Sequence, residues 1–191
     1  MPAMKSAEYH NLLDALVAQP LRSEGWIQER RRLCRRSGHS VAALLVVGSK
    51  FSSLGQFVQY TLCFRHDFLR TLEMIPARGL LTEPDEYPIK IAPSGASQYL
   101  RKGRLRGWAY TPVNLGVRDR EYDTIPYGEL SPEAVERELV ILRSVLQEFV
   151  PAFQEFFTPE EAVRQLRRNG EGAYCERIWI EDYEAFLDAA E

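Results

Sequence analysis

Residues 41–47, Val-Ala-Ala-Leu-Leu-Val-Val, constrain the fold more than any other stretch of this sequence. The run is rich in β-branched residues and apolar at every position, so it predicts a strand that is buried on both faces. A strand of this kind lies near the middle of a sheet. The run is also far shorter than the roughly 20 apolar residues that a membrane-spanning helix needs.

The segments on both sides of this run complete a predicted antiparallel meander. Residues 57–64 alternate between apolar and polar side chains, which is typical of a strand with one buried face. That face is formed by Val58, Tyr60, Leu62 and Phe64. On the other side, residues 26–36 are interpreted as one strand that ends in a turn at Ser37-Gly38-His39. Three consecutive strands with short connections indicate an antiparallel sheet.

Helical patterns begin and end the chain. They predict helices over residues 6–20, 131–151, 158–170 and 182–190. Ser6, Ser131 and Thr158 are the expected caps of the first three, and Ile178-Trp179-Ile180 precedes the last. Between the two groups of helices, a short helix over residues 67–75 and short strands over 87–92 and 124–127 are predicted.

These elements predict a single α+β domain over residues 1–191, a length that can bury one core. Its N-terminal helix and antiparallel β-sheet meander occupy residues 1–128. C-terminal helices, packed on the sheet, occupy an acidic helical portion over residues 129–191.

Charge is unevenly distributed along the chain. The net charge is −3, but residues 129–191 contain 15 acidic and 6 basic side chains, and the rest of the chain is mildly basic. Attraction between two parts of one fold is the simpler explanation. An acidic surface that meets a basic partner is the alternative.

Cysteines and the N-terminus indicate the compartment. Cys34, Cys63 and Cys175 are odd in number and widely spaced, which argues against a disulfide framework. Residues 1–10 lack the apolar segment of a secretory signal. We therefore expect a cytoplasmic protein with no membrane segment.

Candidate catalytic motifs fail on their context. Gly38-His39-Ser40 resembles the start of a hydrolase nucleophile elbow, but an arginine-rich segment precedes it and a β-rich run follows. His66-Asp67 could act as an acid–base pair, although a histidine at a strand end is more common. Asp119, Glu121 and Asp123 are spaced as in calcium loops but lack the required glycine. We expect no metal, no cofactor and no enzymatic activity.

Five arginines between residues 30 and 36 are the strongest basic feature. We interpret this segment as an outer strand whose charges prevent pairing with other chains. The alternative is an anion- or nucleic-acid-binding module, or an uncharacterised enzyme, that also uses a second basic cluster at residues 101–106. Its candidate residues are Arg30, Arg32, Arg35, Arg36, Arg101, Lys102 and Arg104.

Several stretches resemble the bacterial domain of unknown function 4304 family. They are "LRSEGWIQERRRLCRR", "LLVVGSKFSS", "QFVQYTLCF", Trp108-Ala-Tyr110 and "VPAFQEFFTPEEAVRQL". The resemblance covers most of the chain and implies an α+β domain with no established catalytic residues. Small bacterial α+β proteins of this general type accompany secreted toxins as immunity proteins, although fold analogy alone does not establish function.

The leading hypothesis is therefore a non-enzymatic cytoplasmic protein-binding domain, with a toxin as the partner that it neutralises. Carboxylates near the C-terminus would occupy a basic cleft, and aromatic side chains would anchor the complex. The candidate surface comprises Glu171, Tyr174, Glu176, Trp179, Glu181, Asp182, Tyr183 and Glu184. Docking of Trp179 and Ile180 on the core is the competing interpretation of this segment.

Overall fold

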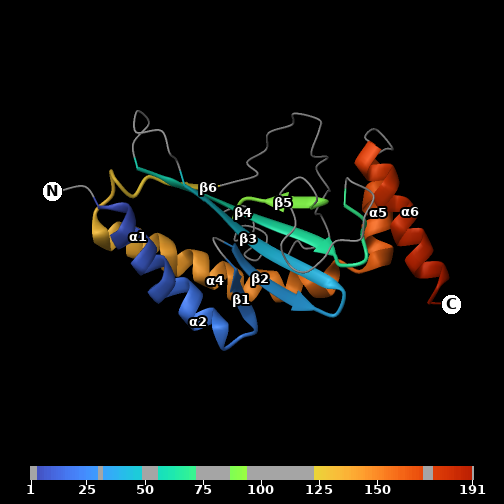
Figure 1. Ribbon diagram of the computed structural model, residues 1–191, viewed down its shortest axis with the longest axis horizontal. Helices are drawn as coiled ribbons and strands as arrows, with labels where there is room; N and C mark the ends of the chain where they lie inside the picture. Colours follow the sequence, from blue (N-terminus) through green and yellow to red (C-terminus); the bar gives the residue numbers. More distant parts are fainter. Residues whose placement is uncertain are drawn as a thin grey trace.

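The computed structural model describes residues 4–29, 32–48, 56–71, 87–93, 123–169 and 174–190, and an antiparallel sheet lies at its centre (Figure 1). Strands β2 (Arg32–Ser37), β3 (Ser40–Gly48) and β4 (Val58–His66) pair consecutively. Gly38, with φ +55°, allows the tight turn between β2 and β3. The predicted central strand, the turn and the strand that follows are confirmed.

Residues 26–36 form two strands, so the prediction of one strand is wrong. Strand β1 (Trp26–Glu29) pairs antiparallel with β2, and Glu29 lies opposite Arg32. In a single strand, Trp26 and Leu33 would point to opposite faces because side chains alternate. The reversal brings both into the main core. The outer strand of the sheet is therefore β1, and the arginine-rich β2 lies one position further in.

Two short strands share the other edge of β4. Strand β5 (Ile89–Ile91) pairs with residues 62–64, and β6 (Asp123–Ile125) pairs with residues 58–60. The predicted strands over 87–92 and 124–127 correspond to β5 and β6. Residues 67–69 form a turn and Arg70 an isolated β-bridge, rather than the start of the predicted helix, and residues 72–75 lie outside the described part of the chain.

Helix α4 (Pro132–Phe156) lies along one face of the sheet (Figure 1). Ser131 Oγ accepts a hydrogen bond from the Ala134 N–H at 3.3 Å, as expected for the predicted cap. The helix does not end at Pro151. Phe149, Val150 and Phe153 are buried on both sides of the proline, and burial of these side chains offsets the roughly 3 kcal/mol that an internal proline costs.

The first helix also continues past its predicted end. It comprises α1 (Ser6–Leu13), a π-helical turn (Asp14–Ala18) and α2 (Gln19–Arg22). Lys5, rather than Ser6, occupies the cap position. Pro20 has no N–H to offer the Leu16 carbonyl. That carbonyl instead accepts a hydrogen bond from Arg143 Nη1 of α4 at 3.3 Å, so a tertiary contact compensates for the proline.

Helices α5 (Pro159–Asn169) and α6 (Tyr174–Asp188) lie together at one end of the sheet (Figure 1). The predicted start and end of α5 are confirmed. Helix α6 begins before Ile178, so the prediction of a last helix from about Asp182 is wrong at its start. Trp179, Ile180 and Tyr183 all fall on the buried side of α6, and the burial of this apolar stripe explains the longer helix.

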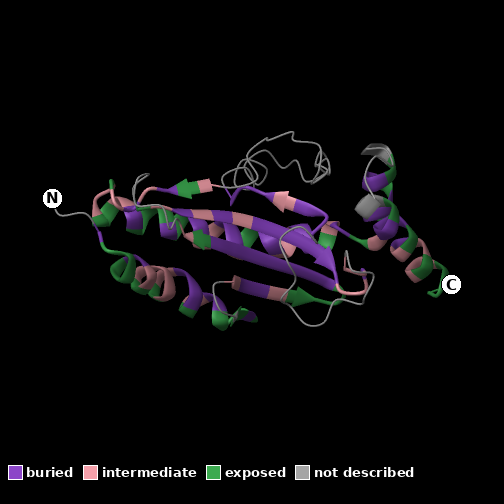
Figure 2. Cartoon of the chain, turned by 45° about the horizontal axis from the view of Figure 1, so that its top comes forward, coloured by how far each residue is buried: buried purple, intermediate pink, exposed green. Residues whose placement is uncertain are grey.

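The core has two parts, one on each face of the sheet. The larger part lies between the sheet and helices α1 and α4, and the smaller one contains Cys34, Ala43, Leu45, Cys63 and Tyr87 on the opposite face. Figure 2 shows the central strands buried along most of their length. The predicted α+β fold is confirmed. None of the helices in the described residues has the length and apolar character needed to cross a bilayer.

Candidate functional site

The described arginines of the predicted anion site are held within the fold. Arg35 Nη1 donates to Gln154 Oε1 of α4, and Arg36 Nη1 lies 3.2 Å from Asp67 Oδ2. Arg32 lines a cavity beside α1. Arg30, Arg101, Lys102 and Arg104 lie outside the described residues. The structure therefore shows no anion site among the basic residues that it describes, and it leaves the 101–104 cluster untested.

The aromatic anchors of the predicted acidic surface lie in the core. Trp179 is 1% exposed and Tyr183 is 0% exposed, so neither can contact a partner. The prediction that they anchor a complex is wrong, because both belong to the buried core once α6 is one continuous helix. Glu171 lies outside the described residues, as do the side chains of Tyr174 and Glu176.

The remaining acids of that surface pair with arginines. Arg70 Nη2 lies 3.1 Å from Glu181 Oε2, and Arg70 Nε lies 2.5 Å from Asp182 Oδ1. Arg167 pairs with Glu184. This arrangement supports attraction within the fold as the explanation of part of the charge asymmetry.

His66 is a core residue and does not pair with Asp67. Its Nδ1 lies 2.8 Å from the Tyr183 hydroxyl, and the ring also hydrogen-bonds to the backbone of Phe157. The Phe157 N–H already donates to Phe153, so the imidazole donates to the Phe157 carbonyl and accepts from Tyr183. Burial lowers the pKa of His66 to about 4. A neutral His66 therefore links β4 to the end of α4 and to α6.

No nucleophile–base pair forms around Ser40. Asp67 Oδ1 bonds to His39 Nδ1 at 2.9 Å, on the surface. Ser40 is 5% exposed, and its Oγ has no hydrogen-bond partner within the described part of the chain. The described residues also contain no group of three or more His, Cys, Asp or Glu that could hold a metal ion.

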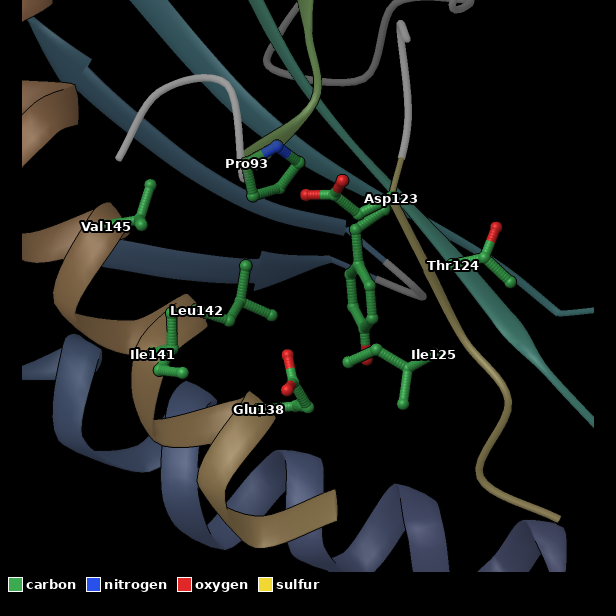
Figure 3. Close-up of a pocket in the computed structure, with 9 residues that line it drawn as sticks. Pro93, Asp123, Thr124, Ile125, Glu138, Ile141, Leu142 and Val145 are labelled. Atoms are coloured by element: carbon green, nitrogen blue, oxygen red, sulfur yellow. The ribbon is translucent and has the colours of Figure 1, made fainter. Parts of the chain in front are cut away.

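A cavity of about 170 Å³ lies between the first half of α4 and strand β6, and we call it the α4–β6 cavity (Figure 3). Its lining is Tyr60, Pro93, Asp123, Thr124, Ile125, Glu138, Ile141, Leu142 and Val145. Asp123 lies directly opposite Tyr60 in the β4–β6 pairing, so both side chains project toward α4. Figure 3 shows Asp123 on β6 and Glu138 on α4 approaching the same space from opposite walls.

Tyr60 distinguishes this cavity from an ordinary packing gap. The side chain is 1% exposed, and its hydroxyl has no hydrogen-bond partner among the described residues. An unsatisfied buried hydroxyl costs roughly 1–3 kcal/mol. The lining of the cavity therefore combines this buried tyrosine, two acidic side chains and aliphatic walls, and Asp123 already takes part in an interaction of its own.

A second cavity, of about 280 Å³, lies between the first helix and β2. Its polar lining includes Asp14 and Gln28, but Arg22 Nη2 bonds to both, at 3.3 and 2.9 Å. Gln19 also donates to Asp14 at 2.8 Å. These groups are satisfied within the fold, so the second cavity has less capacity to bind a ligand.

Sequence reasoning missed the α4–β6 cavity because its lining comes from four separate segments. Tyr60 was placed correctly on the buried face of its strand, and Asp123 was considered only within a calcium-loop pattern. Glu138 lies on the polar side of a predicted helix, where an acid is unremarkable. The sequence did contain one signal. Tyr60 is predicted on the buried face of its strand, and a buried tyrosine hydroxyl normally requires a hydrogen-bond partner.

Comparison with known proteins adds no assignment: no family model, no curated protein and no solved structure matches this chain. The resemblance to the domain of unknown function 4304 family remains a prediction.

Proposed function

We propose that this chain is a non-enzymatic, cytoplasmic protein-binding domain, and that its partner is a bacterial toxin that it neutralises. The observation that supports this proposal is a pair of exposed aliphatic side chains on α4. Val140 is 38% exposed and Ile141 is 52% exposed. Ile141 also lines the α4–β6 cavity. An exposed aliphatic surface beside a cavity is a common feature of protein interfaces.

The charge around these residues favours a basic partner. The exposed glutamates along the first half of α4 and the segment before it are Glu129, Glu133, Glu136 and Glu138. Arg137 is the one exposed cation on this half of α4, because Arg143 is partly buried and bonds to Leu16. Such a surface steers a basic partner toward it and raises the association rate. The binding surface that we propose thus moves from the C-terminal segment to α4.

The described residues give the anion-binding alternative little support. Of its described arginines, Arg35 and Arg36 have partners within the fold, so no observation favours that function over protein binding.

The test uses the product of the adjacent gene as the candidate partner. We expect the two proteins to co-purify and co-expression to relieve toxicity. Ile141→Asn should weaken the complex at least tenfold in a calorimetric titration, because it removes an apolar contact from the interface. Ile27→Asn is the matched control, since Ile27 is 51% exposed on β1.

Two results would contradict the proposal. Toxicity that co-expression does not relieve would exclude neutralisation of that toxin. Equal losses of affinity in Ile141→Asn and Ile27→Asn would exclude α4 as the binding surface.

A further inference from the structure

We propose that His66 is a pH switch for the docking of α6: protonation of its imidazole detaches α6 from the end of the sheet, while the sheet and α4 stay folded. His66 is the last residue of β4 and lies opposite Ser40, the first residue of β3. A change at this end position loosens α6 without breaking the central pairing of the sheet. The switch belongs to the folded chain alone and does not depend on the proposed partner.

The two ring nitrogens of His66 contact different helices. One donates its proton to the Phe157 carbonyl at the end of α4, and Nδ1 accepts from the Tyr183 hydroxyl of α6 at 2.8 Å. A protonated imidazole has an N–H on both nitrogens. The bond to Phe157 survives protonation because it already uses an N–H, whereas the bond to Tyr183 loses its acceptor. Protonation therefore acts on the docking of α6 rather than on α4.

Tyr183 cannot adapt to this change without a cost. The side chain is 0% exposed, and His66 is the hydrogen-bond partner of its hydroxyl within the described residues. If the hydroxyl turned to accept from the imidazolium, its own proton would be buried without an acceptor, which is an expensive state. Detachment of α6 gives both groups access to water and removes this cost.

The charged groups on the sheet side of His66 do not bond to the imidazole. Arg65, the preceding residue of β4, is a buried cation whose Nε donates to the His66 carbonyl at 3.2 Å. The carboxylate of Asp67 is directed to His39, whose Nδ1 lies 2.9 Å from Asp67 Oδ1. A protonated His66 would therefore have no directly bonded counter-charge on this side.

The helices around His66 also lack a carboxylate that bonds to the imidazole in the described part of the chain. Asp182 of α6 pairs with Arg70, and Glu160 of α5 bonds to Thr158. The end of α4 contributes the uncharged ring of Phe157, at 5.1 Å between centroids. Burial outweighs the attraction of the nearby acids and lowers the pKa of the imidazole from 6.5 to about 4. Docking is therefore strongest above pH 6.5 and weakens as the pH falls toward 4.

Side-chain contacts hold α6, and they are separate from those that hold the sheet to α4. The Phe186 ring of α6 stacks on Phe68 at 4.0 Å between centroids. Strands β3 and β4 are held by backbone pairing, and Phe64 of β4 contacts Phe153 of α4 at 4.3 Å. Loss of the histidine–tyrosine bond therefore weakens one interface and leaves the other intact.

Hydrogen exchange measured by mass spectrometry at pH 7.5 and 5.5 tests the switch, after correction for the intrinsic exchange rate at each pH. We expect the opening constant of the amides of residues 178–186 to rise about tenfold at pH 5.5, as a pKa of about 4 when docked and 6.5 when detached requires. The opening constant of the β3 amides should stay at least tenfold smaller at both pH values. Equal opening constants in α6 and β3 would show that the whole domain unfolds, which overturns the inference.

Two variants identify the titrating group. His66→Gln keeps one N–H donor and one acceptor but does not titrate, so the tenfold rise should fall to less than about twofold. His39→Gln removes a second histidine beside α6, whose ring lies 5.0 Å from Phe186 between centroids. A rise that persists in His66→Gln and disappears in His39→Gln would overturn the inference.

Arg70→Gln keeps the test decisive if His66→Gln fails to fold. It removes the ion pairs of Arg70 with Glu181 and Asp182 and leaves the imidazole in place. We expect α6 to open more often at both pH values, with the same tenfold ratio between them. Loss of that ratio would assign the pH response to the ion pairs and would overturn the inference.

Discussion

The two halves of α4 pack against the same sheet in different ways. The second half is tightly packed: Phe153 lies 4.3 Å from Phe64 and 5.5 Å from Phe157, between ring centroids. Gln154 accepts from Arg35 and donates to the Arg35 and Ser40 carbonyls. The first half leaves the α4–β6 cavity and the unsatisfied Tyr60 hydroxyl.

This difference separates polar groups that the fold satisfies from a buried hydroxyl that has no partner among the described residues. At the second half, His66 and Tyr183 are buried and satisfy each other. Ser40 Oγ is the exception there, since it lacks a partner among the described residues. At the first half, aliphatic side chains and acids line a space that the described side chains leave open. Buried tyrosines can therefore have opposite roles within one core, depending on whether the hydroxyl has a partner.

The largest expected effect comes from the tightly packed half. Phe153→Ala removes a fully buried ring and should lower the free energy of unfolding by about 3–5 kcal/mol. Ile141→Ala, on the half that lines the cavity, should change it by less than about 1 kcal/mol because Ile141 is exposed. Urea denaturation followed by circular dichroism measures both. Similar losses in the two variants would remove the contrast between the halves.

A pH titration tests the satisfied network around His66. Its pKa is lowered from 6.5 to about 4 by burial, so the unfolded chain binds a proton in this window and the folded protein does not. The contribution of the neutral, buried His66 to the free energy of unfolding is fully present above pH 6.5 and is lost as the pH falls from 6.5 to 4. The loss should be about 3 kcal/mol, at about 1.4 kcal/mol per pKa unit.

The control for this titration is the comparison of two histidine variants. His66→Gln should flatten the decline in unfolding free energy between pH 6.5 and 4. His39→Gln is the matched control, because it removes a histidine whose side chain is largely exposed. An identical pH dependence in wild type and His66→Gln would show that the burial of His66 is not its cause.

The smallest expected effects come from two variants that each remove one tyrosine hydroxyl, one beside each half of α4, and they give the most direct comparison. Tyr183→Phe leaves His66 Nδ1 without its partner and should cost about 1–2 kcal/mol of unfolding free energy. Tyr60→Phe removes a buried hydroxyl that has no partner among the described residues, so it should be neutral or slightly stabilising. Thermal denaturation of the two variants measures the difference. Equal destabilisation would mean that the Tyr60 hydroxyl is satisfied in solution.

Much of the fold was predictable because short-range patterns determine it. Alternation in residues 57–64 and the apolar run at 41–47 predicted β4 and β3, and the Ser131-Pro132 signal predicted the start of α4. Errors occurred where distant contacts override local signals. Prolines predicted two helix ends that the structure does not have, because Arg143 satisfies the Leu16 carbonyl and because Phe153 remains in the core beyond Pro151.

The sequence by itself determined an α+β fold with an antiparallel sheet, since periodicity decides which side chains are buried. Only the tertiary structure decided which charged and polar groups are paired, buried or gathered in one place. It pairs Arg36 with Asp67 and Arg70 with Asp182, and it buries Trp179 and Tyr183. It also brings Tyr60, Asp123 and Glu138 to one cavity. Such pairings depend on distances between segments far apart in the chain, and a linear pattern contains no information on those distances.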